Sequence, residues 1–425
     1  MGLLALLVGV GLGIAEPPVV PEVPASDAGE EAAVQVSFGF LGQLRYETRA
    51  DAHGVGHGFG LRLARPIVGL ELLRGRVTAR VMPELAGEPR LLDATATVRV
   101  HDALAIQLGQ FRPWLSRGFR TGLNVLPLPG RGAVVDRFRV DRDVGITVFG
   151  RPADGRLEYY AGVMNGGGAG SLRVDGGPLY TARIVVAPLG AVAYTQEPYV
   201  RGPTDLRWAV GASAYTVERR SELDSMGSTG GTRNRQTGAS FDLTVSGGPL
   251  AANAEGFIRT LEVGARPLEW GAYGQLCAMV IERRLSLAVR SGAFSANGGP
   301  NIPLEAGLSV FLARGHAKLQ LAHATDIDVH RAGVSSHRTL VQLQLAFSTY
   351  APGRTQAPAM SWSKHPPRLV KGRHSVPSSV AHESGSAAEH SKVQHCSKSQ
   401  SGTLEPSVHW NPSSQSVDST HGAAC

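Results

Sequence analysis

The chain has 425 residues, a formal net charge of +7 at pH 7 and 42% hydrophobic residues. Its three cysteines have no paired or metal-like spacing, so disulfide bonds are not expected to stabilise it. After residue 15 no segment has the roughly 18 uninterrupted apolar residues of a transmembrane helix, which excludes a helical membrane protein.

The N-terminus is an apolar run, MGLLALLVGVGLGIA (residues 1–15), in which Gly13 and Ala15 are placed like a signal-peptidase cleavage site. We predict a secretory signal peptide, because the run is shorter than the ~20 residues that span a bilayer. An N-terminal membrane anchor is the alternative. Residues 16–33 are rich in Pro, Val and acidic side chains and are expected to form a flexible leader.

Alternation of apolar and polar residues begins in VQVSFGFLGQLRYE (residues 34–47). Because successive side chains of a strand point to opposite faces, this segment is expected to lie between an apolar medium and water. The pattern recurs at residues 76–81, 93–100 and 342–345. Many such strands with arginines on the polar side predict an all-β, transmembrane antiparallel β-barrel whose outer face meets lipid.

The predicted barrel covers residues 34–350. Strands of ~10 residues with their turns and loops take about 20 residues each, which gives about 16 strands. Gly-rich and Pro-containing breaks separate the alternating runs, and the polar insertion at residues 218–238 is expected to be an extracellular loop.

Arginines are densest between Gln110 and Asp143. Alternation in RFRVDRDVGITV (residues 137–148) predicts a strand whose charges face the lumen. Arginine keeps its charge and presents a planar fork of donors that fits oxyanions. The candidate pore-lining residues for anion selectivity are Arg76, Arg80, Arg112, Arg117, Arg120, Arg137 and Arg139.

Each of these arginines has another interpretation: solvation, pairing with a carboxylate in the lumen, or contact with lipopolysaccharide outside. Asp136, Asp141 and Asp143 alternate with arginines, which indicates salt-bridged loop anchors rather than a hydrolase or Ca²⁺ site. The arginines form no basic stripe and no recognition module is present, so nucleic acid is not an expected partner.

The last alternating strand, HRTLVQLQLAF, ends at Phe347, as bacterial barrels commonly end on an aromatic residue. Residues 351–425 are rich in Ser, His, Pro and Lys, have no strand or helix period, and are expected to be disordered. This tail is either a periplasmic extension or the product of a frameshift or mistaken stop, and we favour the second interpretation. We expect no metal site at His395 and Cys396, because no fold positions them.

Several phrases occur in the order found in the phosphate-selective porin O and P family, which this chain resembles. They include LLDATATVRVHDALAIQLGQFRPWLSRGF (91–119), RDVGITVFG (142–150) and YYAGVMNGGG (159–168). The resemblance implies a sixteen-stranded, usually trimeric barrel whose third loop folds inward and selects anions. Phosphate-specific members use lysines beside an arginine ladder, whereas Lys318 is the single lysine before residue 351, so anion preference is implied more strongly than phosphate specificity.

The sequence therefore predicts a passive porin of the bacterial outer membrane that passes small anions such as phosphate through an arginine-lined pore. The alternative is a structural or adhesive barrel whose lumen is plugged by loops. We expect no catalysis and no cofactor, because the histidines offer no plausible Ser/His pairing for a lipase-type enzyme. The expected partners are small anions, outer-membrane lipid and lipopolysaccharide, and two further copies of the chain in a homotrimer.

Overall fold

The computed structural model describes residues 34–51, 54–101, 103–172, 177–198, 205–220, 233–261, 268–296, 299–312, 316–329 and 335–349. The predicted signal peptide (1–15), leader (16–33) and tail (351–425) lie outside these residues. No helix within the described ranges is long and apolar enough to cross a membrane.

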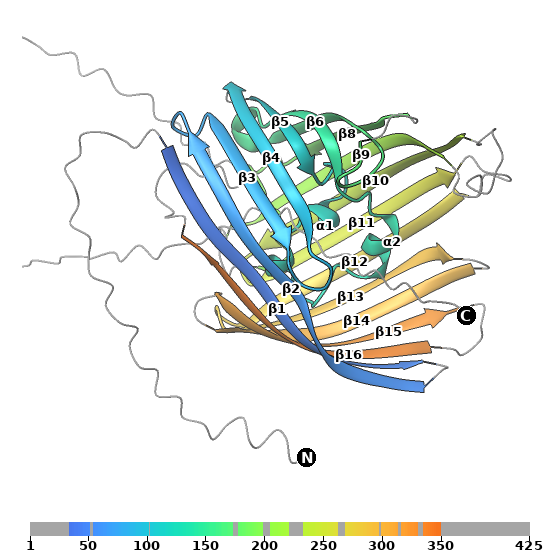
Figure 1. The fold of residues 1–425 in the computed structure, drawn as a ribbon. Coiled ribbons are helices and arrows are strands. Elements are labelled where there is room, and N and C mark those ends of the chain that lie inside the picture. Colours follow the sequence, from blue (N-terminus) through green and yellow to red (C-terminus); the bar gives the residue numbers. More distant parts are fainter. Residues whose placement is uncertain are drawn as a thin grey trace, which may run out of the picture. The chain divides into compact units, whose positions relative to one another are not determined.

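Sixteen strands in the described ranges close into one antiparallel barrel, which confirms the predicted fold class and strand number (Figure 1). The strands are β1 (Val34–Asp51), β2 (Gly54–Leu72), β3 (Val77–Glu84), β4 (Arg90–His101), β5 (Leu104–Phe111), β6 (Asp143–Gly150), β7 (Leu157–Met164), β8 (Leu179–Val186), β9 (Arg207–Arg220), β10 (Arg233–Gly247), β11 (Leu250–Leu261), β12 (Leu268–Ile281), β13 (Leu285–Ala296), β14 (Gly299–Leu312), β15 (Ala317–Asp328) and β16 (Ser335–Ser348). The short helical turns are α1 (Arg117–Arg120), η1 (Leu123–Val125), α2 (Ala133–Phe138) and η2 (Ala153–Gly155).

The first and last strands close the barrel. β1 pairs with β16 over a long register that includes Phe40 opposite Phe347 and Arg45 opposite Gln342. The rings of Phe40 and Phe347 stack with their centroids 5.9 Å apart. Because each strand is paired on both sides, the barrel satisfies its backbone without an open sheet edge.

The two faces of the barrel differ as the alternation predicts. On β15, Leu319 and Leu321 are 36% and 43% exposed on the outer face, whereas Lys318 and Gln320 between them are buried inside. Large apolar side chains are exposed in the same way on strands around the barrel. A closed barrel with an apolar outer face and a polar inner face spans the bacterial outer membrane.

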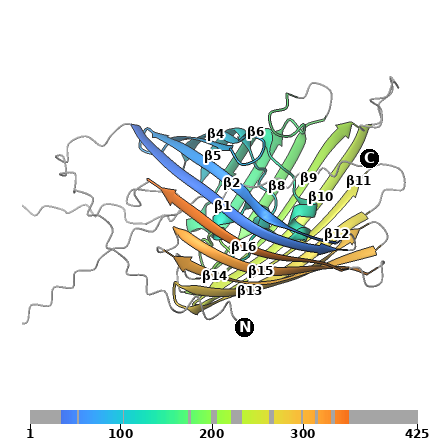
Figure 2. The same ribbon diagram turned by 60° about the horizontal axis from the view of Figure 1, so that its bottom comes forward.

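The wall is uneven in length (Figure 2). β3 and β5 to β8 have 8 residues each, whereas β1 has 18 and β2 has 19. At ~3.3 Å per residue and a tilt of ~40°, an 8-residue strand covers about 20 Å of height. We call β3 and β5 to β8 the low wall.

Two local predictions are wrong. Residues 137–142 are not a strand: α2 ends at Phe138, an extended link follows, and β6 begins at Asp143. The buried residues of α2, Val134, Val135 and Phe138, have the three- and four-residue spacing of one helix face, which outweighs the short alternation. Arg76, expected on a strand, lies exposed in the turn between β2 and β3.

Candidate pore constriction

Residues 112–142 join β5 to β6 and lie inside the ring of strands, where Figure 1 shows α1 and α2. We call this segment the constriction loop. It extends to the far wall, where Arg45 of β1 donates to the carbonyl of Pro129 at 2.8 Å and Ser309 of β14 to that of Pro127 at 2.9 Å. The predicted inward fold of the basic loop is therefore confirmed.

Local sequence explains how the loop begins. The Ser116 hydroxyl accepts from the Phe119 amide at 2.9 Å and so caps α1. The buried carboxylate of Glu255 on β11 accepts from the amides of Arg117 and Gly118, each at 3.0 Å. A Cβ at Gly118 would lie 2.6 Å from the Tyr273 hydroxyl and 2.9 Å from a Glu255 oxygen, so glycine allows this close approach.

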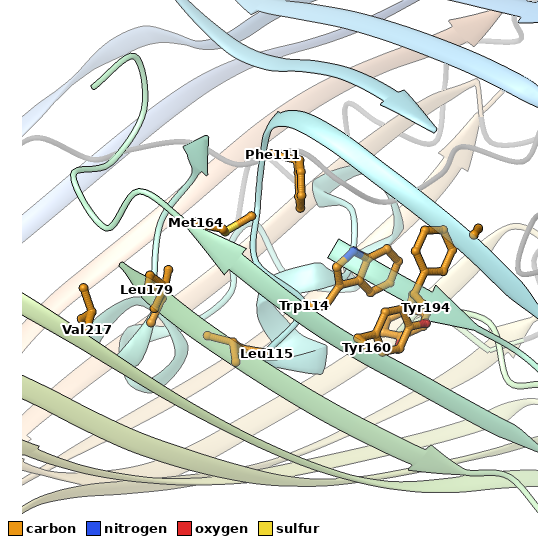
Figure 3. Close-up of a cluster of buried hydrophobic side chains, with 11 residues drawn as sticks. Phe111, Trp114, Leu115, Tyr160, Met164, Leu179, Tyr194 and Val217 are labelled. Atoms are coloured by element: carbon orange, nitrogen blue, oxygen red, sulfur yellow. The ribbon is translucent and has the colours of Figure 1, made fainter. Parts of the chain in front are cut away.

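Aromatic stacking holds the start of the loop against the low wall (Figure 3). The ring of Trp114 stacks on Tyr160 at 4.1 Å with an interplanar angle of 12°, and on Phe149 at 5.7 Å. Tyr194, from the segment after β8, meets the Trp114 ring edge-on at 6.3 Å. At the other end of the loop, Phe138 of α2 stacks on Phe257 of β11 at 5.3 Å.

Three predicted site residues, Arg112, Arg117 and Arg120, lie together in this loop. Their side chains are buried, at 0%, 3% and 4% exposure. Each guanidinium donates to a backbone carbonyl: Arg112 to that of Phe119, Arg117 to that of Ala193 at 2.5 Å, and Arg120 to that of Arg112 at 3.0 Å. Each guanidinium also covers an aromatic ring, most closely Arg120 over Trp114 at 3.3 Å. In the described part of the chain, none of these three forms an ion pair with a carboxylate.

Burial makes the positive charge of the loop costly. It lowers the pKa of Arg112 well below its usual value, and the neighbouring charges of Arg142 and Arg131 lower it further. Burial likewise lowers the pKa of Arg120 to about 10. With a pKa of about 10, the Arg120 guanidinium remains charged at neutral pH. A nearby anion would reduce this electrostatic cost.

The other four predicted residues are scattered. Arg137 is half exposed and pairs with Glu269 at 2.9 Å, and Arg139 lies 3.7 Å from Asp136. Arg80 lies on β3, and Arg76 lies at the barrel end opposite to the one where the constriction loop leaves β5. The structure thus gathers three of the seven residues closely and leaves Arg76 apart from them.

Buried cations on the barrel wall are the main feature that sequence reasoning missed. Three pair with a carboxylate on another strand: Arg65 with Glu84 at 2.6 Å, Arg183 with Asp242 at 2.7 Å and Arg290 with Glu305 at 2.5 Å. The fourth, Lys318, pairs at 2.5 Å with Glu197, which lies in the segment after β8. The alternation of polar and apolar residues on each strand predicted that these cations face inward, but it did not identify the carboxylate with which each one pairs. No group of His, Cys, Asp or Glu in the described ranges has the arrangement of a metal site.

Comparison with known proteins shows which solved structures share this fold. No protein-family model matches the chain, and no curated protein matches it. The anion-selective porin from Comamonas acidovorans is similar in structure, with a TM-score of 0.51 and 13% identity over 74% of this chain and 100% of that one. This chain has the fold of outer-membrane porins.

Two further structures agree. The outer-membrane channel DcaP of Acinetobacter baumannii gives a TM-score of 0.51 at 12% identity, covering 75% of this chain and 99% of that one. OprB of Pseudomonas putida gives 0.52 at 8% identity, covering 74% and 94%. At these identities the likeness establishes the porin fold and leaves the transported solute to be argued from the lumen.

Proposed function

We propose that this porin-fold barrel is a passive channel for small anions, with the constriction loop as its selectivity element. The observation that carries the proposal is the charge of that loop. It holds seven arginines and two aspartates and lies inside the closed barrel. Because an ion in a narrow lumen loses part of its hydration, fixed charge of one sign favours entry of the opposite sign.

The wall cations contribute less to selectivity. Since Arg65, Arg183 and Arg290 each lie against a carboxylate, their fields are largely cancelled at a distance. In Arg112, Nε and Nη2 are buried and make no hydrogen bond with the described residues, so two charged donors are available to an anion that reaches them. The sign of the lumen potential therefore depends chiefly on the loop.

At the finer level, we propose that the channel belongs with the phosphate-selective porins it resembles in sequence and that phosphate is among its solutes. The similar Comamonas structure is described as anion-selective, which supports the anion class. Within this proposal Arg80, Arg112, Arg117, Arg120, Arg137 and Arg139 line or shape the constriction. Arg76, exposed in a turn, has the weakest structural support among the seven residues.

Planar-bilayer recording tests the proposal. The purified barrel is inserted into a bilayer under a KCl gradient, and the reversal potential gives the ratio of anion to cation permeability. We expect a ratio well above one, and added phosphate should reduce the chloride current by competing for the same charges. A ratio at or below one in a conducting channel would rule out the anion proposal.

A plugged structural barrel is the second candidate, and one observation favours it. The constriction loop reaches the opposite wall, and Arg112, Arg117 and Arg120 are almost fully buried. If a correctly folded barrel, judged by its heat-modifiable mobility on gels, gives no conductance in the same bilayer experiment, this second function replaces the first.

We also propose a homotrimer whose subunits meet at the low wall. An apolar band facing lipid is ~25 Å tall, and the 8-residue strands there cover only about 20 Å. A neighbouring copy would remove this mismatch, while the taller wall meets lipid and lipopolysaccharide. Chemical cross-linking in detergent and in native membranes should give a trimeric band, and a monomer under both conditions would contradict the assembly.

A further inference from the structure

A second segment folds into the lumen from the end opposite to the constriction loop. Residues 187–198 follow β8, and we call them the return segment. Its residues Val192, Tyr194, Gln196 and Glu197 are buried. β5 leads into the constriction loop and β8 leads into the return segment, and these two antiparallel strands run in opposite directions. The two segments therefore enter from opposite ends and meet inside.

The two segments contact each other directly. The amide of Gln196 donates to the carbonyl of Val125 at 3.2 Å, and the guanidinium of Arg117 donates to the carbonyl of Ala193 at 2.5 Å. A wall residue, Gln275 on β12, donates to the side-chain oxygen of Gln196 at 3.0 Å. The return segment therefore lies directly against the constriction loop and is also held by the barrel wall.

Lys318 on β15 joins the two segments at one atom. Its Nζ lies 2.5 Å from Oε1 of Glu197 in the return segment, and it donates to the carbonyls of Leu126 at 2.8 Å and Asn124 at 3.2 Å in the constriction loop. Three acceptors thus match the three protons of an ammonium group. The residue is 1% exposed, so water does not substitute for any of them.

The choice of residue supports this interpretation. Lys318 is the single lysine in residues 1–350, where arginine is otherwise used for positive charge. A compact ammonium can satisfy three acceptors that converge on a point, whereas the planar fork of arginine suits two parallel acceptors. Geometry at this position therefore favours lysine over the arginine used elsewhere in the barrel.

We propose that Lys318 and Glu197 are positioning residues that lock the return segment onto the constriction loop and so set the conductance of the channel. This rests on the proposed porin function. Removing the Glu197 charge leaves the Lys318 ammonium buried without its counter-charge, which weakens the attachment of the return segment to the constriction loop. When the return segment leaves the lumen, the passage widens, because its buried side chains no longer fill the space beside the loop.

The test is single-channel recording of Glu197→Gln in the full chain. We expect a rise in unitary conductance of about twofold, with added fluctuations between conductance levels, because the return segment no longer fills part of the lumen. Lys318→Arg should give the same change in weaker form, since its fork cannot satisfy all three acceptors. The exchanged pair Lys318→Glu with Glu197→Lys should not restore conductance, because a carboxylate would face the carbonyls of Asn124 and Leu126.

Arg65→Gln is the matched control. Arg65 also forms a buried pair, with Glu84 at 2.6 Å, but the described contacts include none from it to the return segment or to Gln275. It should leave the return segment seated and produce no added fluctuations between levels. A Glu197→Gln channel with the wild-type conductance and noise would overturn the proposed lock.

A cross-link keeps the test decisive if Glu197→Gln folds poorly. Val125→Cys with Gln196→Cys, with the three native cysteines replaced by serine, should form a disulfide that holds the two segments together. Reduction should then increase current fluctuations, and an identical trace before and after reduction would contradict the lock. If the wild-type barrel shows no conductance and the Glu197→Gln barrel conducts, the open-porin proposal is rejected and the proposed lock is supported.

Discussion

The paired arginines of the wall and three arginines at the start of the constriction loop (Arg112, Arg117 and Arg120) are buried to a similar degree but are stabilised differently. On the wall, Arg183 of β8 lies 2.7 Å from Asp242 of β10, and both side chains are almost fully buried. In the loop, Arg112 and Arg120 bond to backbone carbonyls and cover aromatic rings. The wall pairs cancel charge, whereas the loop contacts hold a guanidinium in place and leave its charge in the lumen.

This difference separates stability from selectivity. Removing one member of a buried pair leaves an uncompensated charge, so the wall arginines should matter most for folding. Neutralising Arg112 or Arg120 removes a positive charge that forms no ion pair with a described carboxylate, so these two loop arginines should matter most for the permeability ratio. Four substitutions test this separation, in order of decreasing effect.

Arg183→Met should have the largest effect on stability. It leaves Asp242 buried without its counter-ion and removes the 2.6 Å bond from Arg183 to the carbonyl of Leu115, so we expect a loss of about 3–5 kcal/mol in the free energy of unfolding. Urea unfolding in detergent, followed by tryptophan fluorescence, measures it. The control Arg235→Met breaks the half-exposed pair with Glu218 and should cost less than about 1 kcal/mol. Equal losses in both variants would contradict the burial argument.

Trp114→Ala removes the aromatic anchor of the constriction loop. We expect a loss of about 3 kcal/mol, because a buried, stacked ring is replaced by a cavity, together with a noisier open channel. The same unfolding assay and single-channel recording provide both readings. Trp270, 43% exposed near the start of β12, supplies the matched control, since its removal should change neither conductance nor noise. A quiet Trp114→Ala channel of wild-type stability would show that the ring does not hold the loop.

Arg120→Gln should change selectivity more than stability. One charge acting over ~10 Å at an effective dielectric constant of ~30 is worth about 1 kcal/mol, which corresponds to a drop of about fivefold in the anion-to-cation permeability ratio. Reversal potentials measure the ratio. Arg76→Gln is the control, because Arg76 is exposed in a turn at the opposite end of the barrel. The loop model of selectivity fails if the Arg76 variant shifts the ratio as much as the Arg120 variant.

Arg137→Gln should have the smallest effect. Arg137 pairs with Glu269 in a partly exposed position, so we expect a stability change below about 0.5 kcal/mol and less than a twofold change in the permeability ratio. Both assays above apply without modification. A larger shift than that of Arg120→Gln would place the selectivity charge at α2 instead of at the start of the loop.

Alternation alone predicted most of the architecture. Inward and outward positions on β15 and β16 follow from parity, because a strand alternates faces whatever lies beside it. The length of the alternating region gave the strand number, and the density of arginines indicated the basic loop. These properties are local, so a single sequence contains them. The same parity failed at residues 137–142, because the interior of the barrel supplied an apolar surface for the helix face of α2.

What the sequence by itself determined is therefore the closed barrel, its outer-membrane setting and the basic segment within it. Only the tertiary structure decided which charges cancel and which segments meet. Arg183 and Asp242 are 59 residues apart, and Lys318 and Glu197 are 121 apart. Such contacts depend on the register of strands around the barrel and on two segments that enter from opposite ends, and neither is encoded by the spacing of neighbouring residues.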